Sequence, residues 1–285
     1  LEDFHVERTS HGALVGNIYK GRVENVHPGL QAAFVGIGLS KNAFLHVSEV
    51  IGPGEEPYHR PQRGERPRGP RRLIQNLLKP GQDVIVQVIR EPFGEKGPSV
   101  TMEVSLPGRF LVLTPLSSKV GVSKKITDLR QRARLRAAVR QFTQDSPSSC
   151  GFIVRTSSAD MTAEDLRSDF DYLQRVWGAV EGRAKTSQPP AALYQETDLV
   201  IRAVRDFFST EIRQVVVEAP EVHRRLCEFF DNVMPRLRAR LQYYGGATPL
   251  FHKARVETQI EQLTGKTVNL PSGGSIVMEP TEGMT

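Results

Sequence analysis

Residues 17–50, NIYKGRVENVHPGLQAAFVGIGLSKNAFLHVSEV, decide the first part of the fold because they predict an antiparallel meander. The stretch holds three runs rich in β-forming residues, separated by turn formers such as His27-Pro28-Gly29. Side chains alternate between the two faces of a strand, so Phe34 and Phe44 should point away from the small aliphatic residues beside them. The three runs are 18–26, 32–37 and 43–47.

The two phenylalanines allow two interpretations. Lys20, Arg22 and His46 are expected on the same side of the sheet, and rings beside cations form a platform on which unstacked bases lie while the cations hold phosphates. Alternatively, a neighbouring domain buries both rings. Alternation alone favours neither interpretation.

Composition sets outer limits on the class of protein. At 285 residues, with 39% hydrophobic and 25% charged residues, the chain reads as an ordinary globular protein of about two domains. Lys and Arg exceed Asp and Glu by 38 to 32, a modest excess that suits a polyanionic partner. No apolar run approaches the roughly 20 residues needed to span a bilayer. The start, Leu1-Glu2-Asp3, is no signal peptide, so we expect a cytoplasmic protein.

The two cysteines and one segment of unusual composition, residues 51–72, indicate no catalytic or metal site by themselves. Cys150 and Cys227 lie in no Cys-x-x-Cys pair, which favours unpaired thiols over a disulfide or a zinc site. Residues 51–72 are dense in Pro, Gly and Arg, a composition that predicts a mobile, solvated loop. A functional alternative is a clamp on RNA phosphates that ignores base sequence.

The segment after this loop should complete a small barrel. Buried strands are predicted at 84–89 and 100–104, and the tight loop 94–97 between them carries Lys96 flanked by glycines. A second unit follows, with strands at 109–113 and 150–156 and a helix at 128–142. Thr162 and Asp165 predict a helix cap before an apolar stripe that includes Trp177, and 185–192 predicts a linker.

Arg155 and Thr156 mark a candidate anion site at a strand end. A planar, bidentate cation beside several hydroxyl groups is what a terminal phosphate needs. Taken on the residues alone, an ordinary solvated strand end is the more common explanation.

The last third predicts an α/β pattern. Helices are expected around residues 199–208, 226–233 and 256–263, with strands at 214–217 and 237–243 and a final strand at 275–278. Residues 4–8 alternate like a strand that has no local partner. The carboxylates of this third show no spacing that would gather them into an active site: Glu211, Glu218, Glu221, Asp231 and Glu261.

Eight short strings, in order and nearly end to end, resemble the ribonuclease E/G family. Each is weak alone, but together they are specific. The strings are GNIYKGRV at 16–23, AAFVGIG at 32–38, AFLHVSE at 43–49, KPGQ at 79–82, SLPG at 105–108, IVRT at 153–156, RAVRDF at 202–207 and LPSGGSIV at 270–277.

The resemblance implies an α+β fold of several subdomains. An S1-type OB barrel and an α+β 5′ sensor would be inserted in an RNase H-like α/β subdomain, which explains the isolated opening strand. The implied boundaries are 1–12 for the first RNase H-like strand, 13–102 for the barrel, 103–195 for the 5′ sensor, 196–264 for the RNase H-like subdomain and 265–285 for the start of a nuclease subdomain.

The resemblance also assigns roles to residues. Phe34, Phe44 and Lys96 match positions that hold RNA, and Arg155 with Thr156 matches the grip on a 5′ monophosphate. That grip is helped by positions matching Gly108, Val112 and Lys124. Lys124 departs from the family, which commonly has Arg there, so a point charge replaces a fork-shaped donor.

Family members cut single-stranded RNA in the processing of ribosomal RNA and the decay of messenger RNA. We therefore expect the RNA-binding, N-terminal portion of an endoribonuclease whose Mg²⁺-binding aspartates lie after residue 285, leaving no catalytic or metal residue in this chain. The resemblance further implies a structural Zn²⁺, homo-oligomers and degradosome-type partners for the longer protein. The alternatives are a non-catalytic module that binds single-stranded RNA and a scaffold without RNA affinity.

Overall fold

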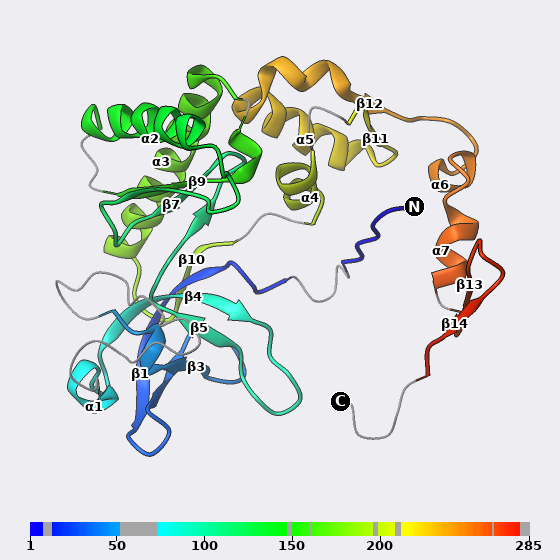
Figure 1. Cartoon of the computed structure of the whole chain (residues 1–285). Coiled ribbons are helices and arrows are strands. Elements are labelled where there is room, and N and C mark those ends of the chain that lie inside the picture. Colours follow the sequence, from blue (N-terminus) through cyan, green and yellow to red (C-terminus); the bar gives the residue numbers. More distant parts are fainter. Residues whose placement is uncertain are drawn as a thin grey trace.

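The computed structural model of the chain describes residues 1–7, 13–51, 73–146, 150–159, 161–195, 199–208, 212–263 and 265–279. Its elements form a barrel, a helix-covered sheet, a smaller α/β group and a C-terminal hairpin with two short helices (Figure 1). Except for Ile51, the predicted loop over 51–72 lies outside the described residues.

Five strands close into a barrel in the order β1-β2-β3-β5-β4, because β4 also pairs with β1. All neighbours are antiparallel except β3 and β5, which are parallel. This closed five-stranded arrangement is compatible with an OB-type barrel. The strands are β1 Ile18–His27, β2 Ala32–Gly36, β3 Ala43–His46, β4 Asp83–Arg90 and β5 Ser99–Thr101, with a short 3-10 helix at Val47–Glu49 and helix α1 at Ile74–Leu77.

The predicted alternation on β2 and β3 is confirmed. Val35 and Leu45 are fully buried in the barrel core, whereas Phe34 and Phe44 face each other across the two strands and are only half-buried. Neither ring belongs to the core of the barrel. The aliphatic side chains therefore supply the apolar burial that stabilises the barrel, and the rings remain on its surface.

A four-stranded sheet in the order β6-β7-β9-β8 forms the second unit, and helices α2 and α3 cover it (Figure 1). The predicted cap of α3 is confirmed, because Thr162 and Asp165 form a capping box. Asp128, the first residue of the helix predicted at 128–142, is the N-cap of α2 and accepts hydrogen bonds from its first turn. Trp177 lies in the core. The elements are β6 Leu106–Pro107, β7 Leu111–Thr114, β8 Val120–Val122, β9 Gly151–Val154, α2 Leu129–Gln144 and α3 Ala163–Thr186.

The segment predicted as a linker at 185–192 ends in a strand instead. Strand β10, Ala191–Tyr194, runs antiparallel to the first residues of β1, on the edge that β2 leaves open. Leu193 of β10 is buried with the core of the second unit. The strand therefore joins the barrel sheet to the α2/α3 unit.

The smaller α/β group has two parallel strands packed against helix α5. The strand predicted at 237–243 is only partly right, because Pro235, at the first helical position, begins a 3-10 helix that runs to Arg240. The elements are α4 Leu199–Phe207, β11 Val215–Val217, α5 Pro220–Val233 and β12 Leu241–Tyr243.

The strand predicted at residues 4–8 is wrong for residues 4–7, which form no strand, and Arg8 lies outside the described residues. These side chains meet helix α4 rather than a strand edge. The ring of His5 stacks on Phe207, and the Glu7 carboxylate accepts hydrogen bonds from Arg202 and from the backbone N–H of Leu199.

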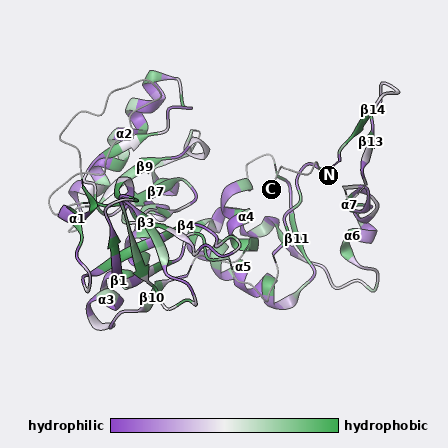
Figure 2. Ribbon diagram, turned by 90° about the horizontal axis from the view of Figure 1, so that it is seen from below, coloured by the Kyte–Doolittle hydropathy of each residue, from purple (hydrophilic) through white to green (hydrophobic). Residues whose placement is uncertain are grey.

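The C-terminal elements lie apart from the rest of the molecule in both ribbon views (Figures 1 and 2). The two strands pair antiparallel and all their residues are exposed. The N-terminal amine of Leu1 donates a hydrogen bond to Gln259 in this region. The elements are α6 Leu250–Lys253, α7 Glu257–Leu263, β13 Thr267–Asn269 and β14 Ser275–Val277.

Candidate nucleic-acid interface

An open groove on the barrel brings together three of the predicted site residues: Phe34, Phe44 and Lys96. The two phenyl rings meet edge to face, with centroids 5.9 Å apart and an interplanar angle of 68°. The groove has a volume of about 760 Å³. It is lined by Leu30, Phe34, Lys41, Asn42, Phe44, Glu95, Lys96, Gly97 and Ser99.

Glycine explains how Lys96 reaches this groove. Phe93 and Lys96 bond to each other through both backbone N–H groups, which closes the tight hairpin after β4. A Cβ at Gly97 would collide with the carbonyl oxygen of Asn42, so only glycine allows the hairpin to lie against the start of β3. Lys96 is exposed there. Lys41, which sequence reasoning missed, lies on the same rim and donates to the Gly94 carbonyl at 3.0 Å.

Two imidazoles continue the row of rings. His27 meets Phe34 edge-on with centroids 5.3 Å apart, and His46 lies nearly parallel to Phe44 at 6.4 Å. His46 was predicted to belong to the platform, and its Nδ1 lies 2.8 Å from the Ser48 hydroxyl. His27 was missed, because in the sequence it reads only as part of a turn.

Lys20 does not lie beside the rings, so that part of the predicted platform is wrong. The Lys20 Nζ donates 2.9 Å hydrogen bonds to two carbonyl groups at the end of α3, where the helix dipole favours a cation. Arg22 pairs with Asp83 at 2.9 Å. Phe34 lies opposite Asn25, five residues beyond Lys20 and therefore about 17 Å along β1.

A second group of predicted residues meets where β9 ends. The Arg155 Nη1 donates to the carbonyl oxygen of Gly108 at 2.6 Å and to the Asp206 carboxylate at 2.8 Å. The Arg155 side chain is 28% exposed, so it is held firmly and still reaches solvent. Asp206 was not singled out by sequence reasoning, because it lies about fifty residues from Arg155.

The loop that follows β9 is bonded to the loop between β6 and β7. The Arg155 N–H donates to the Phe110 carbonyl at 2.8 Å, and the Ser158 hydroxyl donates to the same oxygen at 2.6 Å. Thr156 is exposed and lines a cavity of about 370 Å³ that also contacts Asp206 and Phe207. The two loops therefore form one block that presents Arg155 and Thr156.

A buried carboxylate organises this block. Asp169 of α3 is fully buried and accepts three consecutive backbone N–H bonds, from Arg109 at 3.1 Å, Phe110 at 2.8 Å and Leu111 at 2.9 Å. Burial raises the pKa of Asp169, while the three N–H donors and the charge of Arg155 act in the opposite direction. A Cβ at Gly108 would lie 2.5 Å from the carboxylate, so residue 108 must be glycine for the loop to approach.

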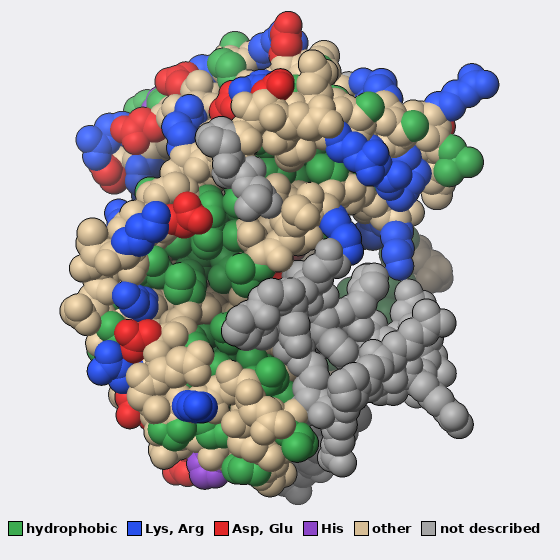
Figure 3. Space-filling model, turned by 90° about the vertical axis from the view of Figure 1, so that its left-hand side faces the viewer, with side chains coloured by type: hydrophobic (Ala, Val, Ile, Leu, Met, Phe, Trp, Pro, Cys, Tyr) green, Lys and Arg blue, Asp and Glu red, His purple; other side chains and the backbone are tan. Residues whose placement is uncertain are grey.

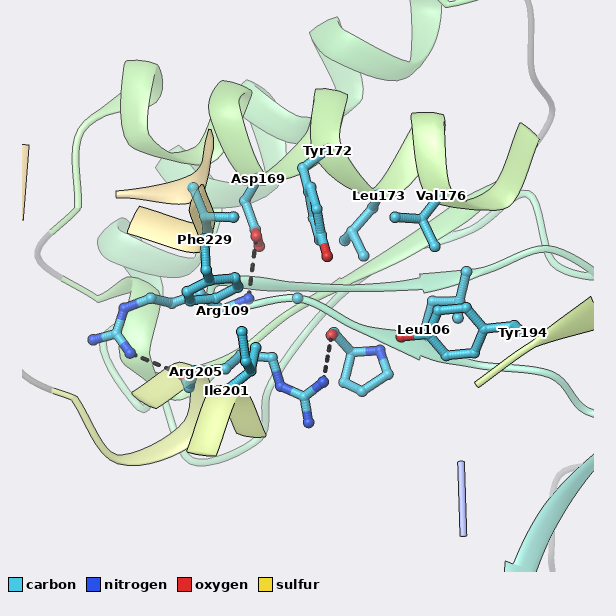
Figure 4. A pocket seen from close by; sticks show the side chains of 13 residues that line it. Leu106, Arg109, Asp169, Tyr172, Leu173, Val176, Tyr194, Ile201, Arg205 and Phe229 are labelled. Carbon is cyan, nitrogen blue, oxygen red and sulfur yellow. Dashed lines mark hydrogen bonds between the residues drawn. The ribbon is translucent and has the colours of Figure 1, made fainter. Parts of the chain in front are cut away.

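The next residue ties the block to helix α4. The buried Arg109 donates from Nη1 to the carbonyl oxygens of Val204 and Arg205 at the helix C-terminus, and the bond to Arg205 is drawn in Figure 4. Its guanidinium lies over the rings of Phe110 and Phe208. Burial lowers the pKa of Arg109 to about 10, so the group stays charged at neutral pH.

The other two predicted phosphate residues lie on a strand of the same sheet and in the loop after one. Val112 of β7 is half-buried and pairs with Ile153 of β9. Lys124 is exposed and follows β8, which runs parallel to β9, so it emerges at the sheet end where Arg155 lies. Arg132 of α2 donates to two carbonyl groups of the loop that carries Lys124.

The charge around these sites is mixed. On the face shown in Figure 3, Lys and Arg side chains are spread around an apolar hollow and are interspersed with Asp and Glu. Residues of opposite charge line the groove, since Glu95 lies beside Lys96.

Within the described ranges, no three His, Cys, Asp or Glu side chains gather in a way that could hold a metal ion. The described residues therefore do not fit a Mg²⁺ centre, which needs oxygen ligands gathered at one point. Cys150 and Cys227, both in the described part, form no disulfide. No helix in these ranges has the length and apolar character needed to cross a bilayer.

A small closed barrel whose open groove is lined by two phenyl rings and a lysine is compatible with the class of OB-type barrels that bind a ligand on one face. Comparison with known sequences narrows this class. Residues 105–285 match the model of the ribonuclease E/G family. The chain is 39% identical to Ribonuclease G of Salmonella typhimurium over its whole length and covers 57% of that relative. It is 34% identical to Ribonuclease E of Haemophilus influenzae, of which it covers 30%.

The chain belongs to the ribonuclease E/G family. It is also 34% identical, over 95% of its length, to Ribonuclease E of a Synechocystis species, and covers 39% of it. The chain thus spans about half the length, or less, of these relatives. Among solved structures, one chain of a Pyrococcus horikoshii complex of a/eIF2alpha, aDim2p and rRNA aligns over 99% of its length with 90% of this chain. The two chains are 13% identical, and the TM-score of 0.23 is too low to bear on the fold.

Proposed function

We propose that this chain is the RNA-binding portion of a ribonuclease E/G-type endoribonuclease that cuts single-stranded RNA during RNA processing and decay. The observation that carries the proposal is the barrel groove, in which Phe34, Phe44 and Lys96 converge although they come from three separate segments.

The groove suits a flexible strand better than a duplex. Two half-buried rings offer faces or edges to unstacked bases of any sequence, and an exposed lysine on the same rim can neutralise a phosphate. The volume of about 760 Å³ and the open shape leave room for more than one nucleotide. Base stacking then supplies most of the affinity, while the lysine adds a component that depends on salt.

The first experiment removes one ring at a time. Phe34→Ala or Phe44→Ala should weaken binding of a short oligouridine by about 1–3 kcal/mol for each lost stack, measured by fluorescence anisotropy with a 3′ label. Phe93→Ala is the matched control, because Phe93 is 77% exposed on the adjacent hairpin but does not line the groove. Equal affinities for all the variants would remove the groove from the proposal.

We further propose that the block at Arg155 recognises a 5′ monophosphate. Arg155 and Thr156 would bind the phosphate, with Gly108, Val112 and Lys124 completing the pocket. The support is geometric, because Arg155 bonds to Gly108, Thr156 is exposed beside it, and Lys124 leaves the same sheet end. A fixed guanidinium that still reaches solvent suits a doubly charged terminal phosphate.

The second experiment compares two versions of one oligonucleotide, bearing a 5′ phosphate or a 5′ hydroxyl. The native chain should bind the phosphorylated version more tightly, and Arg155→Ala should abolish the difference without changing affinity for the hydroxyl version. Arg167→Ala is a suitable control, since Arg167 pairs with the exposed Asp171 and lies over Phe142 and Phe170 of the α2/α3 core. Identical binding of both ends by the native chain would refute the phosphate preference.

For the longer protein we propose a cytoplasmic, Mg²⁺-dependent hydrolase that forms homo-oligomers, holds a structural Zn²⁺ and associates with degradosome-type partners. The α/β group at 196–264 would form its RNase H-like subdomain together with the first residues. In support, Glu7 bonds to Arg202 of α4, and β11 and β12 form a parallel pair beside α5.

A further inference from the structure

We propose that Asp206 is a positioning residue of the phosphate pocket: it holds one corner of the Arg155 guanidinium and so presents the opposite edge of that group to the 5′ phosphate of RNA. This inference rests on the proposed preference for a 5′ monophosphate. It gives a role to a residue of the string RAVRDF, which sequence reasoning used only as a mark of family resemblance.

The hydrogen bonds of Arg155 define which edge is available. A guanidinium carries five N–H groups in a rigid plane, two of them on each terminal nitrogen. Nη1 donates to Gly108 O at 2.6 Å and to Asp206 Oδ1 at 2.8 Å, so both of its hydrogens are used. Among the described residues, neither Nε nor Nη2 of Arg155 has a hydrogen-bond acceptor. These two nitrogens lie side by side and match the spacing of two phosphate oxygens.

The carboxylate does not cancel the charge that a phosphate needs. Asp206 also accepts from Arg205, with Oδ2 3.2 Å from Nη2 and Oδ1 3.4 Å from Nε. Burial opposes the charge of Asp206, but the bonds and charges of Arg205 and Arg155 outweigh burial and hold the pKa of Asp206 below its usual range. Two arginines thus share one carboxylate, and the group of three retains one positive charge for the incoming phosphate.

The backbone fixes the carboxylate in place. Arg205 is buried and donates from Nη1 to the Pro107 carbonyl, while its own carbonyl oxygen accepts from Arg109 (Figure 4). The loop that positions Asp206 is therefore the one that supplies Gly108 O. Both acceptors of Arg155 belong to one rigid unit, so the orientation of the guanidinium is set before RNA arrives.

The test uses the 285-residue chain and the pair of 3′-labelled oligonucleotides with a 5′ phosphate or a 5′ hydroxyl. Asp206→Ala should lower affinity for the phosphorylated oligonucleotide roughly tenfold and leave affinity for the hydroxyl version unchanged, because only the terminal phosphate uses the oriented edge. Asp206→Asn keeps an acceptor oxygen for Arg155 and should retain part of the discrimination. Asp171→Asn, on an exposed carboxylate of α3, is the matched control.

The outcomes separate this inference from the function on which it rests. If the native chain does not distinguish the two ends, the 5′-phosphate preference itself is refuted. If the native chain distinguishes them and Asp206→Ala does so equally well, the positioning role is refuted and the preference stands. Tighter binding of the phosphorylated oligonucleotide by Asp206→Ala would show that the carboxylate competes with phosphate, which also overturns the proposal. Should Asp206→Ala not fold, Asp206→Asn decides alone: undiminished discrimination refutes the role.

Discussion

The barrel groove and the block at Arg155 present their side chains by opposite means. In the groove, Phe34 and Phe44 stand on regular strands and touch mainly other rings, so apolar alternation places them. In the block, hydrogen bonds to Gly108 and Asp206 fix Arg155, and a buried carboxylate, Asp169, holds the loop beneath. A groove of this kind tolerates local change. In the block, loss of one hydrogen-bonded group should disturb the positions of all the others.

The largest effect should therefore follow loss of the buried carboxylate. Asp169→Ala leaves three buried backbone N–H groups without an acceptor and should lower the free energy of unfolding by roughly 3–5 kcal/mol. Urea unfolding followed by circular dichroism measures this. Asp171→Ala, two residues along the same helix, removes only an exposed ion pair and should cost less than about 1 kcal/mol. Similar losses for the two variants would contradict the central place given to Asp169.

An intermediate effect is expected in the groove. Lys96→Ala should reduce the slope of log affinity against log salt by about 0.7, the contribution of one phosphate contact to single-stranded RNA. Gly97→Ala should produce the same change although residue 97 carries no charge, because its Cβ would push the hairpin away from Asn42. Lys79→Ala, at an exposed turn outside the groove, is the control. An unaltered salt slope in Gly97→Ala would show that the hairpin position does not matter.

The smallest effect concerns pH. Because the folded pKa of Asp206 is lowered, its contribution to stability is present above the ordinary aspartate pKa of about 3.9 and is lost as the pH falls through the lowered value. Asp206→Asn should make unfolding less sensitive to acid, by under about 1 kcal/mol because the carboxylate is partly solvated. The raised pKa of Asp169 acts with the opposite sign, favouring the folded state at low pH and losing that benefit as the pH rises. An unchanged acid transition in Asp206→Asn would contradict this assignment.

The same contrast explains what the sequence could predict. Alternation placed Phe34 and Phe44 correctly, and the capping pattern of Thr162 and Asp165 placed the start of α3, because both signals act between near neighbours. Lys20 was misplaced because alternation gives the face of a strand and not the position along it.

Long-range contacts were out of reach for the same reason. Asp169 lies about sixty residues from the backbone groups that it binds, and Asp206 about fifty residues from Arg155, and no periodicity joins such positions. The opening residues 4–7 alternate like a strand, yet the element that they contact is helix α4, which alternation cannot predict.

Strand β10 has a consequence for any RNA that reaches both sites. It follows the α2/α3 unit in the chain and is hydrogen-bonded to the barrel sheet beside Lys20. The ammonium group of Lys20 donates hydrogen bonds to two carbonyl groups at the end of α3. The barrel and the block at Arg155 are thus joined through β10 and Lys20. If one RNA strand binds both proposed sites, a fixed number of nucleotides would separate the 5′ phosphate held at Arg155 from the bases stacked on Phe34 and Phe44.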